Sequence, residues 1–209
     1  RIVTGKTDDN GASCLDDDTG DVADEETNPV MQTNNWLAQG GAIPLLAQAM
    51  SETLVSTIKE CTNNKLCDGC LEYYLNRLTV LASLVDGACL FHADNRKVFC
   101  VEGHTDHVGG GLIICLVCAL HKLEFSVVVQ AEIVTECLRT LTSLTHDNAV
   151  AARELETDYK ELADCWADNE SIRGIDIIGQ TLYEAATGTE SLTEKMRYDC
   201  VIFCLNFLF

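Results

Sequence analysis

The stretch at positions 138–156, LRTLTSLTHDNAVAARELE, constrains the fold more than any other part of the chain. Leu138, Leu141 and Leu144 recur at the spacing of one helix face, and a polar sequence follows them at once. Asp147 and Asn148 are typical helix N-caps, because their side chains accept hydrogen bonds from the free amides of a first turn. We therefore predict a helix, a tight corner and a second helix that Asp147 or Asn148 begins.

A similar sequence, LTVLASLVD, lies 60 residues earlier (138 − 78). Leu78, Leu81 and Leu84 match the three leucines of the later stretch, and Ser83 matches Ser143. Self-similarity of helical units is the signature of a repeat array, in which each unit buries its apolar face against the next. The sequence therefore predicts an all-α fold, a right-handed helical-repeat solenoid of the HEAT or armadillo type. Chance similarity between two leucine-rich amphipathic helices is the alternative.

Glycines and a proline divide the helices from one another. Gly40 and Gly41 end a short helix and Pro44 lies in the first turn of a long one, which is similar to the second and third helices of an armadillo repeat. The run 112–123 is apolar on nearly every side, so we expect that helix at the centre. We also expect helices at 70–91, 94–102, 127–144, 148–165, 172–186 and 192–209. The last one ends in an apolar run without a cap, so we expect the chain to be a fragment of a longer array.

The N-terminal region differs from the rest in composition. Residues 1–28 carry nine acidic side chains against two basic ones and almost no periodic apolar pattern. Such a stretch buries too little apolar surface to fold by itself. We therefore divide the chain into residues 1–33, an acidic disordered segment or an insertion between helices, and residues 34–209, the helical-repeat domain.

The charge of the chain limits its partners. With 33 acidic and 14 basic residues the formal net charge is −19. Because the basic residues form no stripe, we expect no direct contact with nucleic acid and favour basic protein partners. No segment has the 18 or more consecutive apolar residues typical of a membrane span, and no signal peptide opens the chain. We therefore expect no membrane association.

Twelve cysteines are many for a chain of 209 residues. Five of them lie in apolar helical runs, where cysteine packs as a small hydrophobic residue: Cys115, Cys118, Cys137, Cys200 and Cys204. Because no signal peptide is present, we expect a reducing compartment and no disulfide framework.

Cys67 and Cys70 form the best metal candidate, since two thiolates at this spacing can share one zinc ion. Cys100, His104 and His107 lie in another corner that would complete such a site. These two groups of residues are far apart in sequence, and polar residues in a glycine-flanked corner are typical of a solvated loop. We therefore predict no metal and no cofactor. The chain has no nucleophile elbow or phosphate-binding loop, so we predict no enzyme.

The corners between helices are the predicted binding site. In stacked helical repeats the corners line up along the array, so that exposed polar residues there form a ridge. We predict that His146, Asp147, Asn148, Asn95 and Arg96 contact a protein partner. Capping of the following helix is the alternative role of Asp147 and Asn148, because backbone donors would otherwise be unpaired.

The sequence CLRTLTSLTHDN at positions 137–148 resembles a helix end, leucine-x-asparagine-leucine-threonine-histidine-aspartate/glutamate-asparagine, of the Wapl (wings apart-like) cohesin-release proteins. The segments 195–208 and 78–98 are similar to other helices of the C-terminal domain of that family. Together the pieces cover about half of the chain. The chain departs from the pattern at Ser143, where asparagine is usual, and at Ala149, where a polar residue is common.

The resemblance implies a nuclear, all-helical, HEAT-like domain that binds the cohesin core and its HEAT-repeat accessory subunit. Such a domain opens the cohesin ring where the kleisin meets an ATPase subunit, and so releases cohesin from chromatin. The ATP hydrolysis belongs to cohesin, so the resemblance implies no active site. The alternative is a generic armadillo-type scaffold, nuclear or cytoplasmic, that binds extended basic peptides in its groove.

Overall fold

Nine α-helices account for most of the residues that the computed structural model describes, which are 29–62, 68–90, 92–101, 111–156, 173–187 and 193–208. They are α1 Pro29–Gln39, α2 Ala42–Thr62, α3 Asp68–Cys89, α4 Ala93–Val101, α5 Leu112–Lys122, α6 Val128–Thr145, α7 Ala149–Glu156, α8 Gly174–Thr187 and α9 Glu194–Leu208. The all-α prediction is confirmed for this part of the chain. None of the nine helices is long and apolar enough to cross a membrane.

Several predicted features lie outside the described residues. They are the acidic segment over residues 1–28 and the second half of the helix predicted at 148–165, whose first half is α7. For α3, α5, α6, α8 and α9, the observed ends fall within two residues of the predicted ends. The local apolar period was therefore sufficient to locate these helices.

Helix α1 begins before the predicted domain boundary. The sequence assigned residues 1–33 to the acidic segment, but the helix starts at Pro29. Proline suits the first helical position, because the amide it lacks would have no partner there. Gly40 and Gly41 end the helix as predicted. The Gly40 amide donates to the Trp36 carbonyl at 2.8 Å, and Gly41 has a φ of 70°, which favours glycine.

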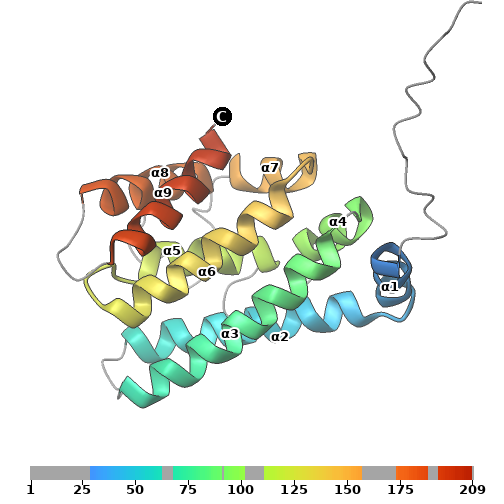
Figure 1. Ribbon diagram of the computed structural model, residues 1–209, viewed down its shortest axis with the longest axis horizontal. Helices are drawn as coiled ribbons and strands as arrows, with labels where there is room; N and C mark the ends of the chain where they lie inside the picture. Colours follow the sequence, from blue (N-terminus) through green and yellow to red (C-terminus); the bar gives the residue numbers. More distant parts are fainter. Residues whose placement is uncertain are drawn as a thin grey trace, which may run out of the picture.

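From α2 onward, each helix packs against the helix three places further along the chain (Figure 1). Helix α5 contacts both α2 and α8, and helix α6 contacts both α3 and α9. The short helices α4 and α7 contact each other as well. As a result, the pair α2–α3 and the pair α8–α9 lie on opposite sides of α5 and α6 (Figure 1).

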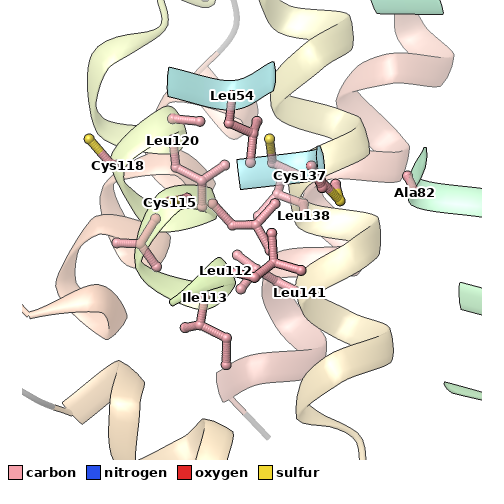
Figure 2. Packing of buried hydrophobic residues seen from close by; sticks show 14 of the residues in the cluster. Leu54, Ala82, Leu112, Ile113, Cys115, Cys118, Leu120, Cys137, Leu138 and Leu141 are labelled. Carbon is pink, nitrogen blue, oxygen red and sulfur yellow. The ribbon is translucent and has the colours of Figure 1, made fainter. Parts of the chain in front are cut away.

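Helix α5 forms the centre of the core, as its sequence predicts. Every residue from Leu112 to Leu120 is buried, because α2, α6 and α8 pack around the helix. Figure 2 shows its side chains among those of Leu54 from α2 and of Leu138 and Leu141 from α6. Full burial on all sides explains why this helix lacks a polar face.

Cysteines fill much of the same core. Cys115, Cys118, Cys137, Cys200 and Cys204 are each at most 1% exposed, and all five are free thiols. The prediction that they pack as small hydrophobic residues is confirmed. Burial raises the pKa of the Cys204 thiol to about 12 and also raises the pKa of Cys137. These thiols therefore stay protonated at neutral pH and are poor nucleophiles.

The buried positions of the helices repeat with a different period from the similar segments of the amino-acid sequence. Leu144 is fully buried, whereas Leu84, which matches it in the 60-residue sequence repeat, is 49% exposed. The buried faces of α3 and α6 correspond at 56 residues (138 − 82) instead of 60. Ala82 then matches Leu138 and Ala88 matches Leu144, and all four are at most 2% exposed. The difference of four residues turns a helix position by about 40°, which is enough to move Leu84 out of the core.

Candidate partner-binding site

The structure brings together residues from two of the predicted corners. Arg96 lies in the first turn of α4, and His146 and Asp147 form the turn between α6 and α7. The Arg96 Nη1 atom donates a hydrogen bond to the His146 carbonyl oxygen at 2.7 Å. This bond joins residues 50 positions apart, next to the contact between α4 and α7.

Asn148 is the cap of helix α7. Its Oδ1 atom accepts a hydrogen bond from the Val150 amide at 3.2 Å. Its Nδ2 atom donates to the Leu144 carbonyl at 2.9 Å and to Cys100 Sγ at 3.2 Å, so one side chain satisfies the end of α6 and the start of α7. Only 6% of Asn148 is exposed, which leaves a partner little to contact. Asp147 is not the cap; its φ of 48° is a left-handed conformation that aspartate tolerates.

Asn95 is buried too, and its amide joins three helices. The Nδ2 atom donates to the Ala88 carbonyl of α3 at 2.8 Å and to the Asn34 carbonyl of α1 at 3.3 Å. Asn34, which sequence reasoning missed, donates from its side chain to the carbonyls of Gly87 and Leu90 at 3.0 and 2.7 Å. Through these bonds the two asparagines satisfy carbonyls at the C-terminal end of α3, which the helix itself leaves unpaired. An asparagine recurring in or before each short helix was the available signal.

The exposed part of the candidate site is formed by His146 and Asp147, and Arg96 beside them is half-buried. The side chains of His146 and Asp147 are 73% and 87% exposed, and the His146 Nε2 atom lies 3.6 Å from Asp147 Oδ2. A cavity of about 330 Å³ lies on one side, among α3, α4 and α6. A second cavity of about 750 Å³ lies on the other side, among α6, α7, α8 and α9. Thr142 and His146 line both cavities, so the corner stands between two adjoining hollows.

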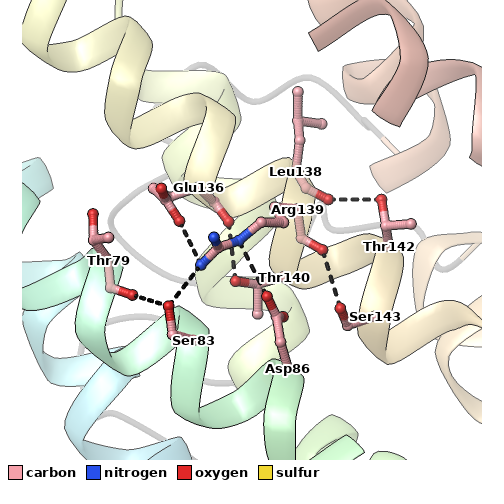
Figure 3. Close-up of polar contacts among 9 residues, drawn as sticks. All are labelled: Thr79, Ser83, Asp86, Glu136, Leu138, Arg139, Thr140, Thr142 and Ser143. Atoms are coloured by element: carbon pink, nitrogen blue, oxygen red, sulfur yellow. Dashed lines mark hydrogen bonds and ion pairs between the residues drawn. The ribbon is translucent and has the colours of Figure 1, made fainter. Parts of the chain in front are cut away.

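An ion-pair network supports the wall of the smaller cavity. Arg139 of α6 pairs with Asp86 of α3, with Nε and Oδ2 3.1 Å apart, and with Glu136 of its own helix, with Nη2 and Oε2 2.8 Å apart. Figure 3 shows the guanidinium group between the two carboxylates and near Ser83. Burial raises the pKa values of Asp86 and Glu136, although the nearby Arg139 charge opposes the shift. The network ties α3 to α6.

Replacing Arg139 with methionine is expected to lower the free energy of unfolding by about 2 kcal/mol at pH 7. Two partly buried carboxylates lose their shared counter-ion, but solvent contact makes the loss smaller than for a fully buried pair. The substitution raises the folded-state pKa values of Asp86 and Glu136 further above their unfolded values. The loss should therefore shrink as the pH falls through those raised values, because the folded state then takes up protons.

Urea unfolding at about pH 7 and about pH 5 measures this difference. The control is Arg77→Met on the exposed face of α3, since Arg77 forms no ion pair with the described residues. It should change the free energy of unfolding by less than about 0.5 kcal/mol. A loss for the Arg139 variant that is equal at both pH values would contradict the proposed role of the carboxylates.

The alternative zinc site falls only partly within the described residues. Cys67, His104 and His107 lie outside them. Cys100 is buried, its thiol is hydrogen-bonded inside the fold, and burial raises its pKa to about 11. Cys70 is exposed. Over the ranges that the structure describes, no three histidine, cysteine or carboxylate side chains are placed to hold a metal ion.

The geometry therefore presents a polar corner, two hollows beside it and buried asparagines beneath it. Hydrogen-bonding and charged groups at such a corner suit contacts with another protein. Of the described cysteine thiols, those whose pKa is shifted by burial are held in the protonated form, which does not favour nucleophilic chemistry. In comparisons with protein-family models, with curated proteins and with solved structures, no match to this chain was found.

Proposed function

We propose that the described helices form a right-handed helical-repeat solenoid of the HEAT or armadillo type. Each unit has a leading helix followed by a packed pair: α1–α2–α3, α4–α5–α6 and α7–α8–α9. The contacts of α5 with α2 and α8, and of α6 with α3 and α9, support this arrangement, because stacked repeats contact their nearest neighbours. The leading helices α4 and α7 begin 56 residues apart (149 − 93), more than the about 40–47 residues of a regular armadillo or HEAT unit. That spacing favours an irregular HEAT-like array.

The function that the geometry supports best is non-enzymatic binding of another protein at the α6–α7 corner. One observation carries this proposal: His146 and Asp147 are strongly exposed between two hollows, on a turn that Arg96 and Asn148 hold in place. A preorganised turn loses little conformational entropy when a partner binds. The contact residues are then Arg96, His146 and Asp147, and Asn95 and Asn148 support them from inside.

Among protein-binding functions, we propose regulation of cohesin release from chromatin, as in the Wapl family. The resemblance at positions 137–148 supports it, because this segment contains the end of α6 and the exposed turn. In this proposal the partners are the cohesin core and its HEAT-repeat accessory subunit, and the chain acts in the nucleus. It needs no catalytic residue, cofactor or metal, and it touches neither nucleic acid nor membrane directly.

A pull-down with purified cohesin core, with and without the accessory subunit, tests the proposal. We expect cohesin to be retained at about 0.3 M salt, where exposed charge contacts are largely screened. The double variant His146→Ala, Asp147→Asn should lower retention by about fivefold or more, since it removes exposed contact groups. It keeps the backbone carbonyl that Arg96 binds, and asparagine tolerates the positive φ at position 147.

The control for this experiment is Glu72→Ala with Asn76→Ala, two exposed positions on α3 away from the corner. This variant should retain as much cohesin as the unaltered chain. Circular dichroism shows whether each variant keeps its helices. If a fully helical chain retains no cohesin, the cohesin proposal is abandoned.

An armadillo-type scaffold for extended basic peptides, nuclear or cytoplasmic, is the second candidate. The net charge of −19 favours it, because a strongly acidic surface attracts cationic segments. This candidate predicts that lysine- and arginine-rich peptides bind and that the affinity falls as the salt concentration rises. Fluorescence anisotropy with labelled peptides measures both. A salt-independent affinity, or no binding at low salt, would rule it out.

A further inference from the structure

Two uncovered apolar faces lie on opposite sides of the helix array. On α3, Tyr73, Val80 and Leu84 are 59%, 60% and 49% exposed. Their spacing of seven and four residues places them within about 40° of one another around the helix. We call this set the α3 face. Because α3 and α9 are the outer helices of the row α3–α6–α9, nothing in the described chain packs over it (Figure 1).

The second face lies at the other end of the row. Among the described residues of α9, Tyr198 and Ile202 are 65% and 39% exposed, and we call this pair the α8–α9 face, because α8 and α9 pack together at this end of the row. On α9, Cys200 points toward α6, because its Sγ atom lies 3.2 Å from Thr135 Oγ1. Residues two positions before and after Cys200 lie about 160° around the helix from it. Tyr198 and Ile202 therefore point away from α6.

The inner helix α6 shows what covers a face of this kind. On the 56-residue correspondence, Val80 and Leu84 of α3 match Glu136 and Thr140 of α6. Thr140 is fully buried and the Glu136 side chain is only 19% exposed, because α3 packs against α6 on this side (Figure 3). The α3 face thus corresponds to the surface of α6 against which α3 packs.

We propose that the α8–α9 face of one copy of this chain packs on the α3 face of a second copy. In this contact, α9 of one copy packs on α3 of the next copy as α3 packs on α6 and α6 on α9 within the chain. Each copy therefore carries both surfaces that the interface needs. Because the two halves are different surfaces, the contact is head-to-tail and adds copies in a row. A net charge of −19 on each copy opposes the contact, so association strengthens as salt screens the repulsion.

Sedimentation velocity of the whole chain tests this inference, from about 5 to about 200 μM and at about 0.15 and 0.5 M salt. We expect the average mass to rise with concentration, and more steeply at the higher salt. Val80→Glu with Leu84→Glu should weaken association by about tenfold or more, and Tyr198→Glu should do the same from the other side. Val128→Glu adds one negative charge, as Tyr198→Glu does, at an exposed position of α6 outside both faces, and should leave association unchanged.

A mixture of the two disabled variants is the most specific measurement. The variant at Val80 and Leu84 keeps its α8–α9 face, and the variant at Tyr198 keeps its α3 face. We expect the mixture to form a one-to-one dimer that grows no further, although neither variant associates alone. All substituted side chains are exposed, and circular dichroism checks that the helices remain.

Two results would overturn the inference. One is a chain that stays monomeric at every concentration and salt tested, and the other is association that the face variants do not change. Neither result affects the proposed function, because the α6–α7 corner lies outside both faces. Conversely, a chain that forms head-to-tail rows but retains no cohesin would overturn only the cohesin proposal.

Discussion

Replacing Leu144 with alanine is expected to lower the free energy of unfolding by about 3 kcal/mol. Leu144 is fully buried near the end of α6. The shorter side chain loses the burial of its methyl groups and leaves a cavity beside them. The cavity closes only in part, because contacts with α3, α5 and α9 hold α6 in place. Urea unfolding of the two proteins measures the loss.

The matched control for this prediction is Leu84→Ala. The text around Leu84 resembles the text around Leu144, but Leu84 is 49% exposed. Its replacement should lower the free energy of unfolding by less than about 1 kcal/mol. Equal losses of unfolding free energy at the two positions would mean that the buried residues follow the 60-residue repeat of the sequence and not the 56-residue repeat of the buried positions.

Replacing Asn95 with aspartate is expected to lower the free energy of unfolding by about 3 kcal/mol or more at pH 7. Aspartate has nearly the same shape, but its ionised form has no hydrogen to donate. The oxygen that replaces Nδ2 would face the carbonyls of Ala88 and Asn34, which accept hydrogen bonds from the Asn95 amide in the parent chain. With 0% of position 95 exposed, no solvent offsets the buried charge.

The pH dependence identifies this cause. Burial without a donor raises the folded-state pKa of the new carboxyl above its unfolded value of about 3.9. The loss is fully present above the folded-state pKa and declines as the pH falls through it, because the protonated acid can donate again. Asn76→Asp at an exposed position of α3 is the control and should cost less than about 0.5 kcal/mol. Thermal unfolding at about pH 7.5 and about pH 5.5 measures both variants; equal melting temperatures for Asn95→Asp and the parent would refute the structural role of Asn95.

Much of the secondary structure could be predicted from the chain alone, because a helix is encoded by neighbours in sequence. Apolar residues at helical spacing located α3, α5, α6, α8 and α9, and Gly40 and Gly41 marked the end of α1. The uniformly apolar sequence of α5 identified the central helix, since a helix without a polar face has to be covered by other helices on all sides. Cysteines in the same runs were recognised as core residues for the same reason.

The candidate site could be predicted only as a region. Local rules favour asparagine and aspartate at a corner both as caps and as exposed polar groups, so they do not separate Asn148 from Asp147. The difference arises from Cys100 and Leu144, whose atoms surround the Asn148 amide. Asn95 is buried for a similar reason, since one of its partners lies 61 residues away.

Local patterns along the chain were enough to predict which segments are helical, where most of them end and which helix lies at the centre. Packing between distant helices sets the register between α3 and α6. It also sets the contact of Arg96 with the His146 carbonyl and the sharing of Arg139 between Asp86 and Glu136. Periodicity shows that a helix has an apolar face, but neighbours distant in sequence decide which residues of that face are covered. For this reason Leu84 is 49% exposed and Leu144 is 0% exposed, although the sequences around them are similar.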